Sequence, residues 1–208
     1  MKNSFKVMLT TALLFTATLS TYAQFEDNRE PSRFHMGLRA GVSSSTYTGD
    51  VSTVDPLWYF TGGLAFDAQV APFPLFVGWG LNYFNEGVEN IKFSNSNYSS
   101  YYYKVKKNAS TIHIPLVIGY HFNLSPNFFI SPYAGGFASY CVEYLDNDKG
   151  WKNKNFNCGL RFGLGLNYGR LTFDAAYDLG LKNRGNSYLK MRNRALFLTL
   201  GVYLVGKR

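Results

Sequence analysis

Strict alternation of apolar and polar residues is the feature that most limits how this chain can fold. In residues 156–168, FNCGLRFGLGLNY, every second residue is apolar, and the residues between them are Gly, Asn or Arg. A period of two belongs to a β-strand whose two faces meet different surroundings. The pattern recurs, with different clarity, in eight segments, at about 34–44, 57–70, 74–84, 109–121, 127–141, 155–168, 171–181 and 194–204. The sequence therefore predicts an all-β protein of eight strands.

The first 23 residues have the pattern of a secretory signal peptide. Lys2 and Lys6 precede an apolar stretch, and Thr21-Tyr22-Ala23 forms a small-residue end before Gln24. The apolar stretch is shorter than the ~20 residues that a membrane-spanning helix needs. We therefore expect residues 1–23 to be a signal peptide, residues 24–33 a periplasmic N-terminal lead, and residues 34–208 the folded domain.

Composition leaves a soluble β protein and a membrane β-barrel both open. Charged residues make up 16% of the chain and aromatic residues 18%, whereas charged residues typically make up ~25% of a soluble domain. After residue 23 no apolar run has the length of a spanning helix. A chain of this kind can enter a bilayer only as a closed barrel, because a barrel satisfies every backbone hydrogen bond internally.

The lengths of the connections favour the membrane barrel. Three connections are tight, near residues 71–73, 123–126 and 169–170. The alternate connections are long and polar, at about 45–56, 85–108, 142–154 and 182–193. Short turns at one end and long loops at the other are typical of a transmembrane barrel with both termini in the periplasm. The sequence thus predicts an eight-stranded antiparallel transmembrane up-and-down β-barrel in a Gram-negative outer membrane; a soluble lipocalin-like carrier is the alternative fold.

The polar face of the strands predicts a packed interior. It has no Lys and consists mainly of Gly, Ala, Thr and Asn with a few charges. The interior of an eight-stranded barrel is only wide enough to be filled by side chains, so we expect no open pore. The apolar face then meets lipid. The fifth segment is disturbed by Pro132 and by Gly135-Gly136, which predicts a kink or bulge there.

Three short motifs resemble a known group of proteins. They are the run IHIPLVIGY at 112–120, PYAGG at 132–136 and LTLGVY at 198–203. In these motifs the chain resembles eight-stranded outer-membrane barrels of the OmpA/OmpX type, and more closely the PorT-like "outer membrane protein beta-barrel domain" proteins. The resemblance implies fold and location. It implies no reaction, and PorT itself is linked to a secretion apparatus.

Two charged residues are predicted to pair inside the barrel. Reflecting the chain about the tight turn near residue 169.5 sets Arg161 opposite Asp178, and both lie on the polar face. A single charge in a confined interior would carry a large desolvation cost, so a partner is expected. Asp174, Arg39 and Asp67 are expected to extend this pair into a network.

The two cysteines flank the third long connection. If the strands pair about a centre near residue 149.5, Cys141 lies opposite Cys158, and a disulfide could form in the oxidising periplasm. Two unbonded thiols in lipid-facing or rim positions are the alternative.

Basic residues are concentrated in the long connections. Of the 19 that follow residue 23, 12 lie in the three later long loops or, in the case of Arg194, directly after the last of them. Contact with the anionic phosphates of lipopolysaccharide and simple solvation are both consistent with this placement. The residues proposed to make lipopolysaccharide contacts are Lys104, Lys106, Lys107, Lys152, Lys154, Arg184, Lys190 and Arg192. Nucleic acid is not an expected partner for a secreted protein.

No motif indicates a cofactor, a metal or a catalytic site. The three histidines are His35, His113 and His121, and the chain has no HExxH, CxxC, Walker or GxSxG element. We therefore expect a non-enzymatic protein that acts through four long extracellular loops, in a structural or interaction role that includes accessory functions in secretion or attachment. The alternative is a small lipid A-modifying enzyme that uses His113 with a loop serine and an acid.

Overall fold

Ten β-strands make up the fold in the computed structural model. The structure describes residues 34–53, 56–70, 73–93, 101–144, 155–184 and 190–206. Within these ranges no helix is long and apolar enough to cross a membrane. The signal peptide and the lead before residue 34 lie outside the described residues, and both stay predictions.

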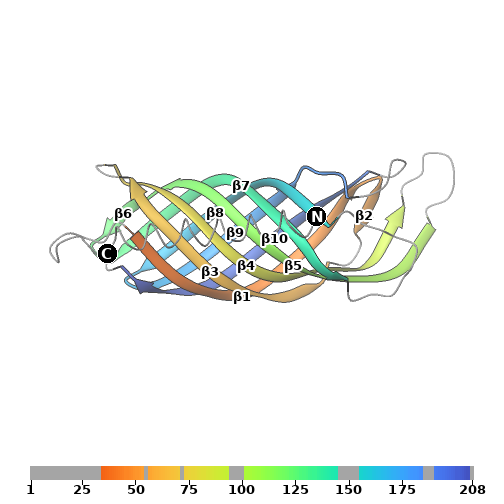
Figure 1. Ribbon diagram of the computed structural model, residues 1–208, viewed down its shortest axis with the longest axis horizontal. Helices are drawn as coiled ribbons and strands as arrows, with labels where there is room; N and C mark the ends of the chain where they lie inside the picture. The colour runs from red at the N-terminus through yellow and green to blue at the C-terminus, as the bar shows by residue number, and fades with distance from the viewer. Residues whose placement is uncertain are drawn as a thin grey trace.

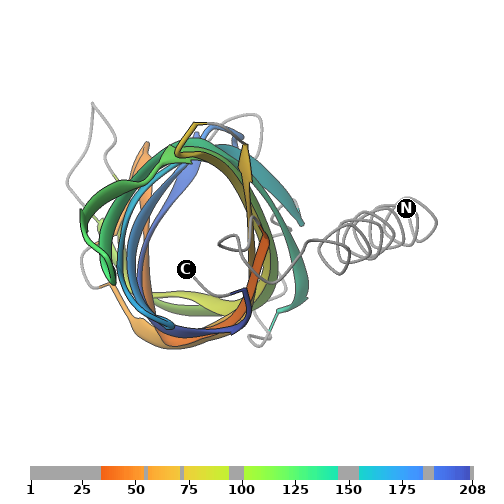
Figure 2. The same ribbon diagram turned by 90° about the vertical axis from the view of Figure 1, so that its left-hand side faces the viewer.

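Eight long antiparallel strands close into a barrel. They are β1 (Phe34–Gly49), β3 (Trp58–Val70), β4 (Leu75–Phe93), β5 (Tyr101–Tyr120), β7 (Phe128–Tyr144), β8 (Phe156–Tyr168), β9 (Leu171–Gly180) and β10 (Met191–Val205). Each pairs with its neighbours in the chain, β1 pairs with β10, and β4 pairs with β5, so the ring has no open edge (Figure 2). The predicted eight-stranded antiparallel barrel is confirmed.

Two short strands add to this ring. β2 (Val51–Thr53) pairs with the far end of β4, and β6 (Phe122–Ser125) pairs with the start of β7. We call the end of the barrel at β6 and at the turn between β8 and β9 the short-turn end, and the opposite end the long-loop end (Figure 1).

Several strands continue beyond their predicted limits at the long-loop end. β4 runs to Phe93 and β5 begins at Tyr101, so most of the predicted loop 85–108 is a paired hairpin that extends past the rest of the barrel (Figure 1). β1 and β10 also extend into the predicted loops, to Gly49 and from Met191. The predicted limits were too short because hydrophobic alternation fades where both faces of a strand meet a polar medium, although backbone pairing continues.

The two faces of the strands are as predicted. Along β9, residues from Leu171 to Gly180 alternate between a side chain turned outward and one buried in the lumen, and Thr172, Asp174 and Asp178 are all buried. On β10 the outward Leu200 is 67% exposed, whereas the neighbouring inward Phe197 is 3% exposed. An apolar outer face and an enclosed polar inner face both suit a barrel in lipid.

Inward glycines allow the strands to approach closely. A Cβ atom at Gly41 would collide with the backbone of Leu198, and one at Gly159 would collide with the backbone of Leu179. At these two positions of the polar face, packing between neighbouring strands requires glycine.

The disturbance predicted in the fifth segment is smaller than expected. The ladder on one side of β7 pairs Tyr133 with Gly119 and Ile130 with Phe122, and it skips Pro132, which has no backbone N–H to donate. Gly135 and Gly136 stay in register with both neighbouring strands. The register shift of this strand lies instead near Cys141, against the Ser110/Thr111 step of β5.

The predicted pairing of the two cysteines is wrong. Cys158 lies opposite Ala138, and the backbone N–H of Cys141 donates to the carbonyl of Asn155 at 2.8 Å. The register differs by three residues from the predicted one, and an odd shift places the two side chains on opposite faces. Cys141 is 1% exposed and faces the lumen, Cys158 lies on the outer face, and no disulfide joins them.

The arrangement predicts two thiols in the mature protein. Denaturation without reductant, followed by alkylation and mass spectrometry, should add two alkyl groups, because the two side chains lie on opposite faces of the barrel wall. Prior reduction serves as the control and should not raise that number. Alkylation that appears only after reduction would contradict this register.

Candidate functional site

Arg161 and Asp178 form a buried ion pair in the half of the lumen that is nearer the long-loop end. They face each other across the β8–β9 ladder, and the Arg161 guanidinium donates to both carboxylate oxygens of Asp178, at 3.1 and 3.2 Å. His113 approaches from β5, with its Nε2 atom 2.7 Å from Asp178 Oδ2. The Arg161 guanidinium also lies over the ring of Phe197, 4.8 Å from its centroid. Side chains from four strands, β5, β8, β9 and β10, therefore gather around this ion pair.

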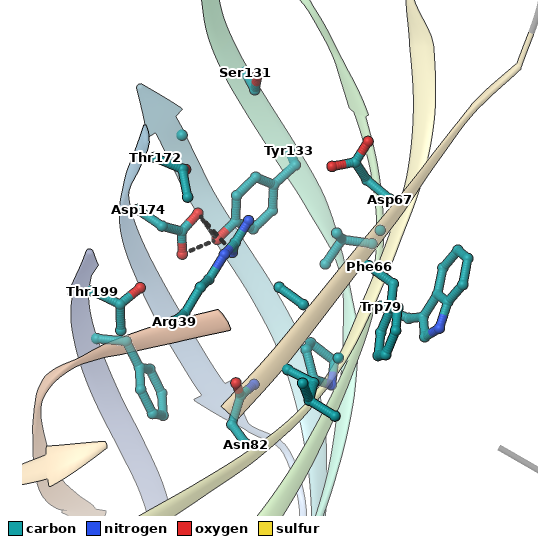
Figure 3. A pocket seen from close by; sticks show the side chains of 18 of the residues that line it. Arg39, Phe66, Asp67, Trp79, Asn82, Ser131, Tyr133, Thr172, Asp174 and Thr199 are labelled. Atoms are coloured by element: carbon teal, nitrogen blue, oxygen red, sulfur yellow. Dashed lines mark hydrogen bonds and ion pairs between the residues drawn. The ribbon is translucent and has the colours of Figure 1, made fainter. Parts of the chain in front are cut away.

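A second cluster lies nearer the short-turn end (Figure 3). Tyr133 donates its hydroxyl to both oxygens of Asp174, each at 2.9 Å, and Arg39 lies 3.5 Å from the same carboxylate. The Asp67 carboxylate lies 2.8 Å from His35 Nδ1 and also interacts electrostatically with Arg39. Arg161 in turn interacts with Tyr133 and Asp174. The residues predicted to form one network therefore lie at successive depths of the lumen and interact electrostatically from one level to the next.

Aromatic rings fill the lumen at the level of Arg161. Phe84 packs edge-on against Phe197 at 5.0 Å, and His113 lies 5.1 Å from Phe137 and 5.4 Å from Phe197, between ring centroids. These four rings form a layer that we call the aromatic plug. Phe197 and Arg161 line a cavity of about 60 Å³ on one side of it. The other three rings line a cavity of about 10 Å³ towards the long-loop end.

A further ion pair lies between the aromatic plug and the long-loop end. Arg184, in the connection between β9 and β10, donates to Glu86 Oε2 of β4, and each side chain is 1% exposed. Arg184 was predicted to contact lipopolysaccharide, and this prediction is wrong because the side chain turns into the barrel. A charged residue in a loop has no alternation pattern to show which way it points.

The remaining basic residues are distributed around the outside or lie beyond the described part. Lys190 and Arg192 are exposed at the long-loop end, as is Arg194, and Lys182 Nζ lies 4.5 Å from the ring centroid of Phe156. For three of the predicted lipopolysaccharide contacts the structure describes only the backbone: Lys104, Lys106 and Lys107. Two others lie outside the described residues: Lys152 and Lys154.

The outer face of β10 changes character at one point. Arg192 and Arg194 point outward, and the next five outward residues are all aliphatic, from Leu196 to Leu204. Arg194 lies beside Leu179 of β9 and Thr46 of β1 in the two ladders. The outer face of β10 therefore changes from basic to apolar between Arg194 and Leu196.

No catalytic arrangement is evident among the described residues. No group of three or more His, Cys, Asp or Glu side chains is placed to hold a metal ion within these ranges. His113 is 1% exposed and already engages Asp178, deep within the plug. The chemistry that the interior does support is charge pairing and exclusion of solvent.

The fold and the interior together define an integral β-barrel protein of the outer membrane. A family model described as "outer membrane protein beta-barrel domain" matches residues 22–184, and the chain belongs to this family. A search of curated proteins found no match.

Solved barrels are similar in fold. One is Ail of Yersinia pestis in complex with the heparin analogue sucrose octasulfate, at 13% identity, with 82% of this chain and 98% of that chain covered and a TM-score of 0.45. Another is Neisserial surface protein A, which is 14% identical, with 84% of this chain and 99% of that chain covered and a TM-score of 0.41. The N-terminal barrel of Pseudomonas aeruginosa OprF is 14% identical over 81% and 97%, with a TM-score of 0.35.

The buried pair should make a strongly non-additive contribution to stability. Arg161→Ala or Asp178→Ala alone is expected to cost about 3–5 kcal/mol, because each leaves a buried charge without its ion-pair partner. The double variant should cost less than the sum of the two. The measurement is urea-induced loss of the compact, fast-migrating band in detergent micelles. Additive effects, or a smaller cost for each single variant than for a surface substitution such as Arg170→Ala, would contradict the assignment.

Proposed function

We propose that this protein is a non-enzymatic structural or interaction protein that acts from the long-loop end of its barrel, with that end outside the cell and both ends of the chain in the periplasm. The change from arginine to aliphatic residues along the outer face of β10 carries the proposal. Accessory roles in secretion or attachment are specific forms of it.

The segment of β10 from Arg194 to the last outward aliphatic residue, Leu204, has the length that a membrane requires. From Arg194 to Leu204 the strand advances about 33 Å, at ~3.3 Å per residue. A tilt of ~40° reduces this to about 25 Å along the barrel axis, which matches the height of the apolar band of outer-membrane barrels. This length supports a position of Arg194 at the level of the lipid headgroups, at the end of the barrel where the paired strands extend furthest.

The headgroup level is where phosphates of lipopolysaccharide would be met. A guanidinium can donate two parallel hydrogen bonds to one phosphate, and two such groups follow each other at Arg192 and Arg194 on one face of β10. Lys190 and Lys182 add positive charge at the same end. We infer that this basic rim anchors anionic glycolipid around the barrel.

The plugged interior supports a role without transport. Arg161 and the four rings of the plug lie between the two cavities, and both ion pairs are buried. Breaking such pairs to open a path would leave unpaired charges in a confined space, which is strongly unfavourable. The enzymatic alternative would need His113 to reach a lipid, although its ring is enclosed by Phe84, Phe137 and Phe197.

The topology can be tested by labelling intact cells. With both native cysteines replaced, Lys190→Cys should react with a membrane-impermeant maleimide, because residue 190 is exposed at the long-loop end. Ser125→Cys, exposed at the short-turn end, is the matched control and should react only after the outer membrane is permeabilised. Reversal of the two results would invert the proposed orientation.

Lipid binding should depend on the two outward arginines. The Arg192→Gln/Arg194→Gln variant should bind lipid A about tenfold more weakly than the unmodified protein, from about 0.7 kcal/mol for each of the two exposed contacts. Dephosphorylated lipid A should show no difference between the two proteins. Native mass spectrometry of the protein in detergent gives the measurement.

Arg170→Gln is the control, because Arg170 is exposed at the opposite end of the barrel. Equal binding by all three proteins would contradict the phosphate contacts. Lipid A whose acyl chains or phosphates differ between cells with and without the protein would instead favour the enzyme.

A further inference from the structure

A small cavity lies between the two buried ion pairs of the long-loop half. Glu86, bonded to Arg184, lines one part of it, and His113 and Asp178 line another. Its volume is about 10 Å³. A polar space of about 10–15 Å³ holds a single water molecule. The cavity therefore has room for one ligand of that size.

Four buried polar atoms in the lining make no hydrogen bond within the protein. They are Glu86 Oε1, His113 Nδ1, Asn157 Oδ1 and Asn193 Oδ1. Their side chains belong to residues that are between 1% and 4% exposed, and they come from four different strands. An unsatisfied buried polar atom is unfavourable, so a hydrogen-bond donor in this space would be stabilised by those of the four atoms that it reaches.

The chemistry of these atoms identifies the partner. Because an ionised carboxylate can only accept, the hydrogen between His113 and Asp178 is assigned to His113 Nε2. In the neutral ring Nδ1 is then an acceptor, as is Glu86 Oε1. The occupant must therefore donate at least two hydrogens. A cation would add net charge to a region where Glu86 with Arg184 and Asp178 with Arg161 already balance. A neutral donor of this size is water, and its oxygen can accept from an asparagine amide.

We propose that this cavity binds one ordered water molecule, which donates to Glu86 Oε1 and His113 Nδ1 and so joins the two ion pairs into a single network. The network runs from Arg184 through Glu86, the water and His113 to Asp178 and Arg161. It couples the start of the β9–β10 connection, which leads to the basic rim, to the aromatic plug. This inference does not depend on the proposed function.

A crystal structure at a resolution that shows ordered water tests the site directly. The expected result is one peak about 2.7–3.2 Å from both Glu86 Oε1 and His113 Nδ1. An anomalous peak at this position after soaking in rubidium chloride would show a cation and overturn the proposal. A direct bond between Glu86 and either asparagine that closes the cavity would also overturn it.

A double-mutant cycle tests the coupling. Arg184→Met and Asp178→Asn alter two ion pairs that do not touch, so the proposal expects their shifts in the urea midpoint to be non-additive. The matched control uses Asp174→Asn in place of Asp178→Asn. Asp174 also points inward from β9, four residues from Asp178, and does not line this cavity. Additive shifts in both cycles would overturn the coupling. If a variant fails to fold, the crystallographic measurement on the unmodified protein still decides the site.

Discussion

The closed hydrogen-bond ladder is the constraint on which the rest of this structure depends. In lipid, no solvent is available for a backbone N–H or carbonyl, so each strand must be paired on both sides. The pairings of β4 with β5 and of β1 with β10 leave none of the eight long strands unpaired on either side. Closure in turn makes the two faces of every strand unequal, because one meets lipid and the other a lumen that only side chains can fill.

A filled lumen explains why the interior combines charges with rings. Eight strands leave too little space for bulk water, yet the alternation that keeps the outer face apolar places polar residues inside. The structure resolves this conflict by pairing: Asp178, Asp174 and Glu86 each face an arginine, and Asp67 faces His35. The aromatic plug then occupies the space that these pairs leave. Charge pairing and ring packing therefore serve the same requirement.

Sequence patterns predict local relations well in this fold. The faces of β8, β9 and β10 follow from alternation alone, and the two-residue connection after Tyr168 sets Arg161 against Asp178 because a tight turn leaves only a narrow choice of register. The long connection between β7 and β8 has no such limit. A shift of three residues there was enough to place Cys141 and Cys158 on opposite faces.

Contacts across the lumen are beyond the reach of such patterns. His113 and Asp178 are both assigned to the interior by alternation, but they lie on strands that are not neighbours in the ladder, so no register relates them. The same holds for Glu86 and Arg184, which come from β4 and a loop. Alternation along each strand predicts which side chains point into the lumen, whereas the barrel diameter and the strand tilt decide which of these side chains contact each other.

The two ends of the barrel differ in a way that follows from this packing. At the short-turn end the connection between β8 and β9 is only two residues long. At the long-loop end the paired strands continue, and a loop residue, Arg184, returns into the lumen to meet Glu86. A loop fixed at one point to the interior of a rigid barrel has fewer conformations to lose when its neighbours bind a ligand. The backbone N–H of Arg184 also donates to the carbonyl of Met191, which lies between Lys190 and Arg192, so the residue that forms the buried ion pair is bonded directly to the strand that carries the basic rim.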